Sequence, residues 1–295
     1  MQKWWRRVSS LPYDLSIFGT QKPADIERND TTMNREQEPG RVLITAGAAG
    51  IGRVLARSFL ENGYRVHVCD VNPDSLAQSL AGQAGLTGSR ADVGDPAQVD
   101  ELFAAVRENL GGLDLLINNA GIAGPTAAVE DISTTEWRET LAVDLDGPFF
   151  CCRAAVPLLR QSDAGSIINI ASNAGLFGFP FRLPYAVSKW ALIGMTKTLA
   201  MELGPAKIRV NALCPGSVAG QRIEGVMQRD AAQQGVSTDE IRRLYTRQTS
   251  LRCFVEPEDV AAMALFLASP AGSRISGQAI GVDGHTEGLS NFQEY

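Results

Sequence analysis

The sequence has few of the residues that mark a secreted, metal-binding or membrane protein. Its 295 residues include five cysteines and two histidines. The cysteines form no C-x-x-C pair and mostly lie in apolar runs, where a thiol behaves as a small hydrophobic group. We therefore expect no metal site, no disulfide framework and a reducing compartment, which favours a cytoplasmic protein.

Long apolar runs and a surplus of basic residues are also missing. No stretch approaches the roughly 18 uninterrupted apolar residues of a membrane-spanning helix. The formal net charge is -6, and an acidic surface repels the phosphate backbones that clustered Lys and Arg attract. We therefore expect neither a membrane nor a nucleic acid as partner.

Residues 1–39 differ in composition from the rest of the chain. Basic residues flank Trp4 and Trp5, and polar and charged residues run from 21 to 39. The segment lacks the apolar core of a secretory signal. We expect an N-terminal extension that is disordered or that precedes a working start at Met33, with a targeting or docking arm as the alternative.

From Arg41 onward, short β-branched runs alternate with longer segments of helical period, as in β-α-β units. The predicted strands include 42–45, 65–70, 113–118, 166–171, 208–213 and 278–282. The predicted helices include 50–62, 134–161, 185–203 and 257–268, and another that begins at Asp95-Pro96 and ends at Gly111. The pattern indicates one α/β domain, residues 40–295, with a doubly wound parallel sheet.

A glycine-rich turn, TAGAAGIG, joins the first predicted strand to its helix. Glycines there let the backbone approach a pyrophosphate, whose charge the first amides of the helix stabilise, although close packing of strand on helix also favours small residues. Asp70 ends the second strand, where a carboxylate accepts hydrogen bonds from ribose hydroxyls and repels a 2′-phosphate. Neither Val71 nor Asn72 offers a compensating positive charge, so the sequence favours NAD over NADP.

Together with motifs further along, this region resembles the short-chain dehydrogenase/reductase family from Arg41 to Gly288. Asp92-Val93 is similar to the family's adenine-contacting pair, Asn118-Asn119-Ala120-Gly121 to its N-N-A-G turn, and Pro215-Gly216 to the turn that passes the nicotinamide. The resemblance implies a Rossmann-like fold, a small-molecule substrate and a homodimer or homotetramer. It implies cofactor contacts from Gly47, Gly50, Ile51, Gly52, Asp70, Asp92, Val93, Asn119, Ala120, Gly121, Tyr185, Lys189 and Val218.

Ser172, followed after twelve residues by Tyr185-Ala186-Val187-Ser188-Lys189, resembles the family's catalytic Ser and Y-x-x-x-K. A Tyr and a Lys four apart lie on one helical face. A phenol, with an ordinary pKa of about 10, is a poor base at neutral pH, and a nearby ammonium favours its ionised form. The resemblance implies that Tyr185 takes the hydroxyl proton, Ser172 holds the substrate oxygen and Lys189 also binds the nicotinamide ribose.

Three positions depart from the family's pattern. Ala46 replaces the first motif glycine, so a methyl group lies where the loop is tightest. We expect Gly47 to adopt part of the unusual backbone conformation in its place, and cofactor affinity to change. Asp144 stands where the family has its proton-relay asparagine; an ionised carboxylate cannot donate hydrogen bonds, so we retain Asp144 as a catalytic candidate with its relay function open. Gly220 replaces a threonine that holds the carboxamide, which shifts that task to the Val218 backbone.

The segment 217–253 is expected to form a flap over the site, and it carries six arginines. Arg182 lies three residues before Tyr185, and a guanidinium there can hold a carboxylate, sulfonate or phosphate with two hydrogen bonds. We expect Ser172, Arg182 and Tyr185 to contact the substrate. The alternative is that the arginines are solvated or paired with the flap's own carboxylates.

These observations predict an NAD-dependent oxidoreductase that moves a hydride between nicotinamide and a small hydroxy or oxo compound with a polar or anionic end. One alternative is a catalytically weak NAD-binding sensor or scaffold, because a fold alone does not establish activity. Another is a 3-oxoacyl-thioester reductase, which Asp70 disfavours because such biosynthetic enzymes use NADPH.

Overall fold

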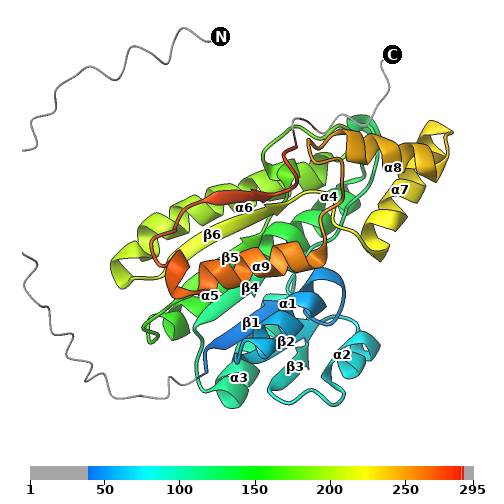
Figure 1. The fold of residues 1–295 in the computed structure, drawn as a ribbon. Helices are drawn as coiled ribbons and strands as arrows, with labels where there is room; N and C mark the ends of the chain where they lie inside the picture. Colours follow the sequence, from blue (N-terminus) through cyan, green and yellow to red (C-terminus); the bar gives the residue numbers. More distant parts are fainter. Residues whose placement is uncertain (1–38, 287, 289–295) are drawn as a thin grey trace, which may run out of the picture. The chain divides into compact units, whose positions relative to one another are not determined.

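The computed structural model describes residues 39–286 and 288. The predicted extension, residues 1–39, therefore lies outside the described part of the chain except for Pro39. Seven strands form one sheet in the order β3-β2-β1-β4-β5-β6-β7, and every neighbouring pair is parallel. The prediction of a doubly wound parallel sheet is confirmed (Figure 1). The strands are β1 Arg41–Thr45, β2 Arg65–Asp70, β3 Leu86–Arg90, β4 Leu115–Asn118, β5 Ser166–Ile170, β6 Arg209–Pro215 and β7 Ala279–Val282.

Helices connect the strands and cover both faces of the sheet. They are α1 Gly50–Glu61, α2 Pro73–Leu80, α3 Pro96–Leu110, α4 Thr134–Leu141, α5 Gly147–Leu159, α6 Leu183–Leu203, α7 Gln221–Gln234, α8 Thr238–Arg247 and α9 Pro257–Ala268. With one exception, the predicted elements end within two residues of these bounds. None of the helices in residues 39–286 is both long and apolar enough to cross a membrane.

The exception is the helix predicted over 134–161, which is wrong as a single element. It consists of α4, a π-helical segment Ala142–Asp146, and α5. Pro148 has no N–H for the carbonyl four residues earlier, and the Gly147 N–H bonds to the Ala142 carbonyl five residues back. The wider turn carries Asp144, whose side chain is completely buried.

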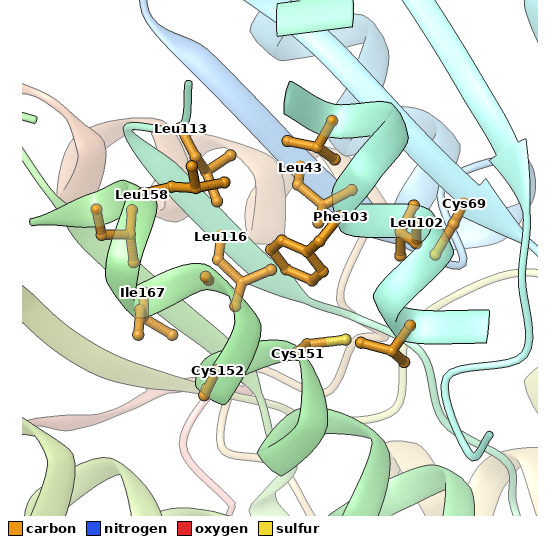
Figure 2. Packing of buried hydrophobic residues seen from close by; sticks show 14 of the residues in the cluster. Leu43, Cys69, Leu102, Phe103, Leu113, Leu116, Cys151, Cys152, Leu158 and Ile167 are labelled. Atoms are coloured by element: carbon orange, nitrogen blue, oxygen red, sulfur yellow. The ribbon is translucent and has the colours of Figure 1, made fainter. Parts of the chain in front are cut away.

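The core lies on both faces of the sheet, since successive strand residues point to opposite sides. On one face α1 and α9 pack against residues such as Ile44 and Val68, and on the other α3 and α5 pack against Leu43 and Leu116. Figure 2 shows Phe103 of α3 among Leu43, Leu116 and Cys151. Complete burial of such a ring contributes about 1.5–3 kcal/mol to stability.

From β1 the chain adds strands toward one edge of the sheet, and from β4 it adds them toward the other edge, so the order reverses between β1 and β4. The segments that follow these two strands leave in opposite directions, so a crevice opens at the carboxyl ends of the strands, where ligands bind in this architecture. The predicted flap contains α7 and α8, which lie beyond the same ends (Figure 1). Bridges from Val218 to Val255 and from Thr249 to Thr286 join the flap's two ends to the body of the domain.

Candidate active site

The loop between β1 and α1 is tied to the loop after β4. The Thr45 Oγ1 accepts hydrogen bonds from the backbone N–H groups of Asn119 and Ala120, both at 2.9 Å. A Cβ added to Gly52 would lie 2.0 Å from the Ala46 carbonyl oxygen, and one added to Gly47 would lie 2.5 Å from a Val68 methyl carbon. These two glycines are therefore required by close packing beneath the loop.

Backbone strain in this loop falls on Ala46 and not on its neighbour. Ala46 has φ 48° and Gly50 has φ 51°, whereas Gly47 is not among the residues with positive φ. The expectation that Gly47 takes part of the demand is wrong, because its N–H is held by the Cys69 carbonyl at 3.0 Å. An alanine here adopts the left-handed conformation that usually favours glycine.

Asp70, at the end of β2, has a fixed orientation at the rim of the crevice. One carboxylate oxygen accepts the Asn72 N–H at 3.0 Å and the other accepts the Ala48 N–H at 3.3 Å. Arg53, in the first turn of α1, lines the same cleft, and the sequence analysis missed it. Its position directly after the G-I-G of the loop was the available signal.

A cleft of about 810 Å³ extends from Asp70 and the start of α1 to the flap. Ten of the predicted site residues line it: Gly50, Ile51, Asp70, Asn119, Gly121, Ser172, Arg182, Tyr185, Lys189 and Val218. Six do not: Gly47, Gly52, Asp92, Val93, Ala120 and Asp144. The Asp92 carboxylate accepts the Gly94 N–H at 2.9 Å, and Val93 packs in the core.

Tyr185 lies in the first turn of α6, which begins at Leu183 with Pro184 near its start. The unpaired amides and dipole of a helix N-terminus favour negative charge close to that turn. Lys189 follows one turn later, and its Nζ lies 5.5 Å from the centre of the Tyr185 ring. The Lys189 side chain is buried, and its Nζ donates to the Ile170 carbonyl at 3.4 Å.

Ser172 follows β5 and lies at the carboxyl end of the sheet. Its Oγ accepts the Ala174 N–H at 3.1 Å and lies 3.3 Å from the Asn173 Oδ1. The Asn173 amide in turn donates to the Thr286 hydroxyl at 3.1 Å. Asn173 also lines the cleft and was missed by the sequence analysis.

Asp144 lies behind the cleft wall, against Lys189. Its Oδ1 accepts the Ile122 N–H at 2.7 Å, and its Oδ2 lies 3.4 Å from both the Lys189 Nζ and the Ser188 Oγ. The structure thus brings Asp144 together with Lys189, although Asp144 does not face the substrate side.

Arg182 is 4% exposed, yet it lines the cleft. Its Nη2 donates to the Ala123 carbonyl at 2.8 Å, and its guanidinium carbon lies 5.4 Å from the Phe179 ring centre and 5.6 Å from that of Tyr185. The Nε has no hydrogen-bond partner, and no ion pair within the described residues involves Arg182. Burial lowers the pKa of Arg182, because a charged group loses solvation there.

The flap arginines mostly have local partners. Arg242 pairs with Glu224 at 2.6 Å, and the Arg243 Nε donates to the Asp239 carbonyl. Arg222 lines the cleft but donates to the Gly121 carbonyl at 3.1 Å. The alternative that the arginines pair with the flap's own carboxylates therefore holds for Arg242. It does not hold for Arg182, which is buried at the cleft without an ion pair in the described part of the chain.

Two backbone features support a ligand-facing role for the loop after β6. The bridge to Val255 uses the Ser217 carbonyl and the Ala219 N–H, so the Val218 backbone groups point the other way. Gly220 has φ 137°, a conformation that side-chain-bearing residues rarely adopt, which explains why glycine replaces threonine there. Among residues 39–286, no cluster of three His, Cys, Asp or Glu is arranged to hold a metal.

Comparison with known proteins gives concordant matches. A family model described as "Enoyl-(Acyl carrier protein) reductase" matches residues 46–286. A D-beta-hydroxybutyrate dehydrogenase from Rhizobium meliloti is 31% identical over 249 residues, covering 82% of this chain and 96% of that enzyme. A trans-4-hydroxycyclohexanecarboxylate dehydrogenase from Sinomonas cyclohexanicum is 36% identical and covers 85% of this chain and 94% of its own.

A solved structure is also similar over most of its length. The actinorhodin polyketide ketoreductase crystallised with NADPH has a TM-score of 0.80 and 32% sequence identity, and the match covers 87% of this chain and 99% of that one.

Proposed function

Because this chain belongs to the short-chain dehydrogenase/reductase family, an oxidoreductase family that binds a nicotinamide cofactor, we propose that it uses NAD and that Tyr185 is its general base and acid. The enzyme transfers a hydride between the cofactor and a CH–OH or carbonyl carbon of a small molecule. The observation that carries the proposal is the presence of Ser172, Tyr185 and Lys189 on one cleft with Asp70 at its far end.

The residues around the cleft suit a dinucleotide. Ala48, Ala49 and Gly50 line the cleft where α1 begins, so the backbone there can approach a pyrophosphate closely. Arg53 adds a positive charge for phosphate oxygens. The Asp70 carboxylate favours ribose hydroxyls over a 2′-phosphate, which supports NAD.

The side chains at the other end suit proton transfer. When bound, the nicotinamide ring accepts or supplies the hydride. In alcohol oxidation Tyr185 removes the hydroxyl proton, and the Lys189 ammonium and the α6 N-terminus stabilise the phenolate that does so. Ser172 Oγ, fixed by the Ala174 N–H, donates a hydrogen bond to the substrate oxygen.

The first experiment is a screen of hydroxy acids and neutral alcohols with NAD and NADP in parallel, for wild type and Tyr185→Phe. We expect turnover with NAD, retained NADH binding in the variant, and a loss of kcat of about 100-fold or more, the usual contribution of acid–base catalysis. Wild-type rates in Tyr185→Phe would refute its role. Cofactor binding without any turnover would favour a sensor.

For the substrate, we propose a small hydroxy or oxo carboxylic acid whose carboxylate pairs with Arg182. A buried guanidinium without an ion pair carries a large desolvation penalty that an arriving anion offsets. Asp230, the flap carboxylate whose charge acts on Arg182, accepts a hydrogen bond from the Tyr245 hydroxyl at 2.8 Å. Two relatives, by their names, act on hydroxy acids, which supports the same class.

Arg182→Gln tests this substrate class. With a hydroxy acid we expect kcat/KM to fall about 10- to 100-fold, since hydrogen bonds to charged groups contribute about 1.5–3 kcal/mol. With a neutral alcohol of the same shape we expect a change below about threefold. Arg222→Gln, on the same cleft, is the matched control, and equal losses on both substrates in Arg182→Gln would contradict the carboxylate contact.

A second candidate is reduction of a 3-oxoacyl thioester, because one relative, 35% identical over 246 residues, is named as a 3-oxoacyl-[acyl-carrier-protein] reductase. It predicts faster turnover with NADPH and an acyl thioester than with NAD and a hydroxy acid. The position of Asp70 favours the NAD-linked dehydrogenase.

A further inference from the structure

Asp144 has no part in the proton transfer described above. The side chain is 0% exposed and belongs to the π-helical segment between α4 and α5. Buried carboxylates need hydrogen bonds or a cation, because an unpaired buried charge is strongly destabilising. Asp144 has both: the Ile122 N–H at 2.7 Å and the Lys189 Nζ at 3.4 Å.

Backbone groups of the loop after β4 and of the end of β5 lie close to the pair. A Cβ added to Gly121 would lie 3.2 Å from the Lys189 Nζ and 3.3 Å from the Asp144 Oδ1. The Ile170 carbonyl, at 3.4 Å from Nζ, completes the surroundings of the ammonium. Within the described residues, Asp144 is the carboxylate that forms an ion pair with Lys189.

Other charged or titratable groups lie on the elements packed around Lys189: Tyr185 and Arg182 at α6, Cys214 on β6, Asp283 after β7, Glu136, Arg138 and Glu139 on α4, and Asp146 beside Asp144. Burial raises the pKa of Cys214 to about 11, so it is a neutral thiol. Asp283 accepts the backbone N–H groups of His285 and Thr286. Arg138, Glu139 and Asp146 are exposed, and Glu136 closes the capping box of α4.

We propose that Asp144 is the buried counterion of Lys189 and that it offsets the stabilisation that the Lys189 ammonium gives to the ionised Tyr185 hydroxyl. The proposal rests on the proposed function of Tyr185 and Lys189. Two cations flank the Tyr185 ring, the Lys189 Nζ at 5.5 Å and the Arg182 guanidinium at 5.6 Å from its centre, and Asp144 offsets the first of them. Asp144 is thus a positioning residue that acts through Lys189.

An asparagine at this place would hold no negative charge, so the ammonium would stabilise the phenolate more strongly. Asparagine has nearly the same shape. Its amide oxygen can still accept the Ile122 N–H and its NH₂ can donate to the Ser188 Oγ, now 3.4 Å from Oδ2. The substitution therefore removes one charge, together with the Lys189 contact, and keeps the hydrogen bonds to Ile122 and Ser188.

The test is the pH profile of alcohol oxidation for wild type and Asp144→Asn, with thermal unfolding to verify the fold. In a plot of log kcat against pH, we expect the acid limb to shift toward lower pH by about one unit. At a given low pH, the variant should then retain a fraction of its maximal kcat that is about tenfold larger than the fraction wild type retains. Asp146→Asn, an exposed carboxylate in the same π-helical segment, is the matched control, and we expect its acid limb to stay in place.

A second measurement does not require turnover. Difference absorbance of the tyrosinate band, taken between each protein and its Tyr185→Phe counterpart without cofactor, should show the same downward shift in Asp144→Asn. An unshifted band and limb in Asp144→Asn, or an equal shift in Asp146→Asn, would overturn the proposal. If Asp144→Asn does not fold, Asp144→Ser also removes the carboxylate and allows the same two measurements. A shifted tyrosinate band in a protein whose wild type shows no turnover would contradict the proposed function but not the role of Asp144.

Discussion

At the residue scale, Ala46 shows how one substitution within a motif changes where backbone strain lies. The alanine keeps the left-handed conformation of the loop, at φ 48°, because Gly47 is held by β2 and cannot take it over. A non-glycine residue in this conformation costs about 1–2 kcal/mol. The loop keeps its shape at the expense of stability.

Ala46→Gly should therefore stabilise the protein. The relief of strain exceeds the added chain entropy of glycine, about 0.5–1 kcal/mol, so we expect the free energy of unfolding to rise by about 0.5–1 kcal/mol. Denaturant unfolding measures the change. Ala104→Gly, at an exposed interior position of helix α3, is the control and should lose about 1 kcal/mol; a loss in Ala46→Gly of the same size would show that the loop is unstrained.

At the scale of elements, the pairing of β2 with the edge strand β3 contains a buried histidine. His67 is 0% exposed, and its ring nitrogens lie 2.7 Å from the Thr87 hydroxyl and 2.9 Å from the Ser89 hydroxyl. Burial lowers the pKa of His67 to about 4. The neutral ring thus links two strands by hydrogen bonds that run beside the backbone ladder.

This histidine makes stability depend on pH. The unfolded chain binds a proton at His67 near its ordinary pKa of about 6.5, and the folded protein does so only near 4. The contribution of neutral His67 is therefore complete above about pH 6.5 and declines as pH falls, by about 2 kcal/mol between about pH 7 and about pH 5. Denaturant unfolding at both pH values should show that His67→Gln loses this part of the pH dependence, and an unchanged dependence would contradict it.

The break between α4 and α5 is a second element-scale feature. Hydrophobic periodicity continues across 134–161, so a pattern alone predicts one helix, and the missing N–H of Pro148 changes the register locally. The functional consequence is the burial of Asp144 against Lys189.

At the scale of the whole molecule, the site is assembled from segments far apart in the chain. The loops after β1, β4, β5 and β6 meet at one end of the sheet, and α7 and α8 complete the cleft. A homodimer or homotetramer stays a prediction, as does the cytoplasmic location. The exposed apolar side chains of Phe149 on α5 and of Val187 and Trp190 on α6 support the oligomer.

The sequence by itself determined the α/β class, most of the strands and helices and the positions of Asp70, Ser172, Tyr185 and Lys189, because local periodicity, turn residues and motif spacing are short-range properties of the chain. Tertiary structure decided which of the predicted residues share the cleft, that Ala46 carries the strain, that Arg182 is buried without an ion pair, and that Asp144 pairs with Lys189. Those features depend on contacts between residues tens of positions apart, and no local pattern encodes the burial and distance on which the energy of a charge depends.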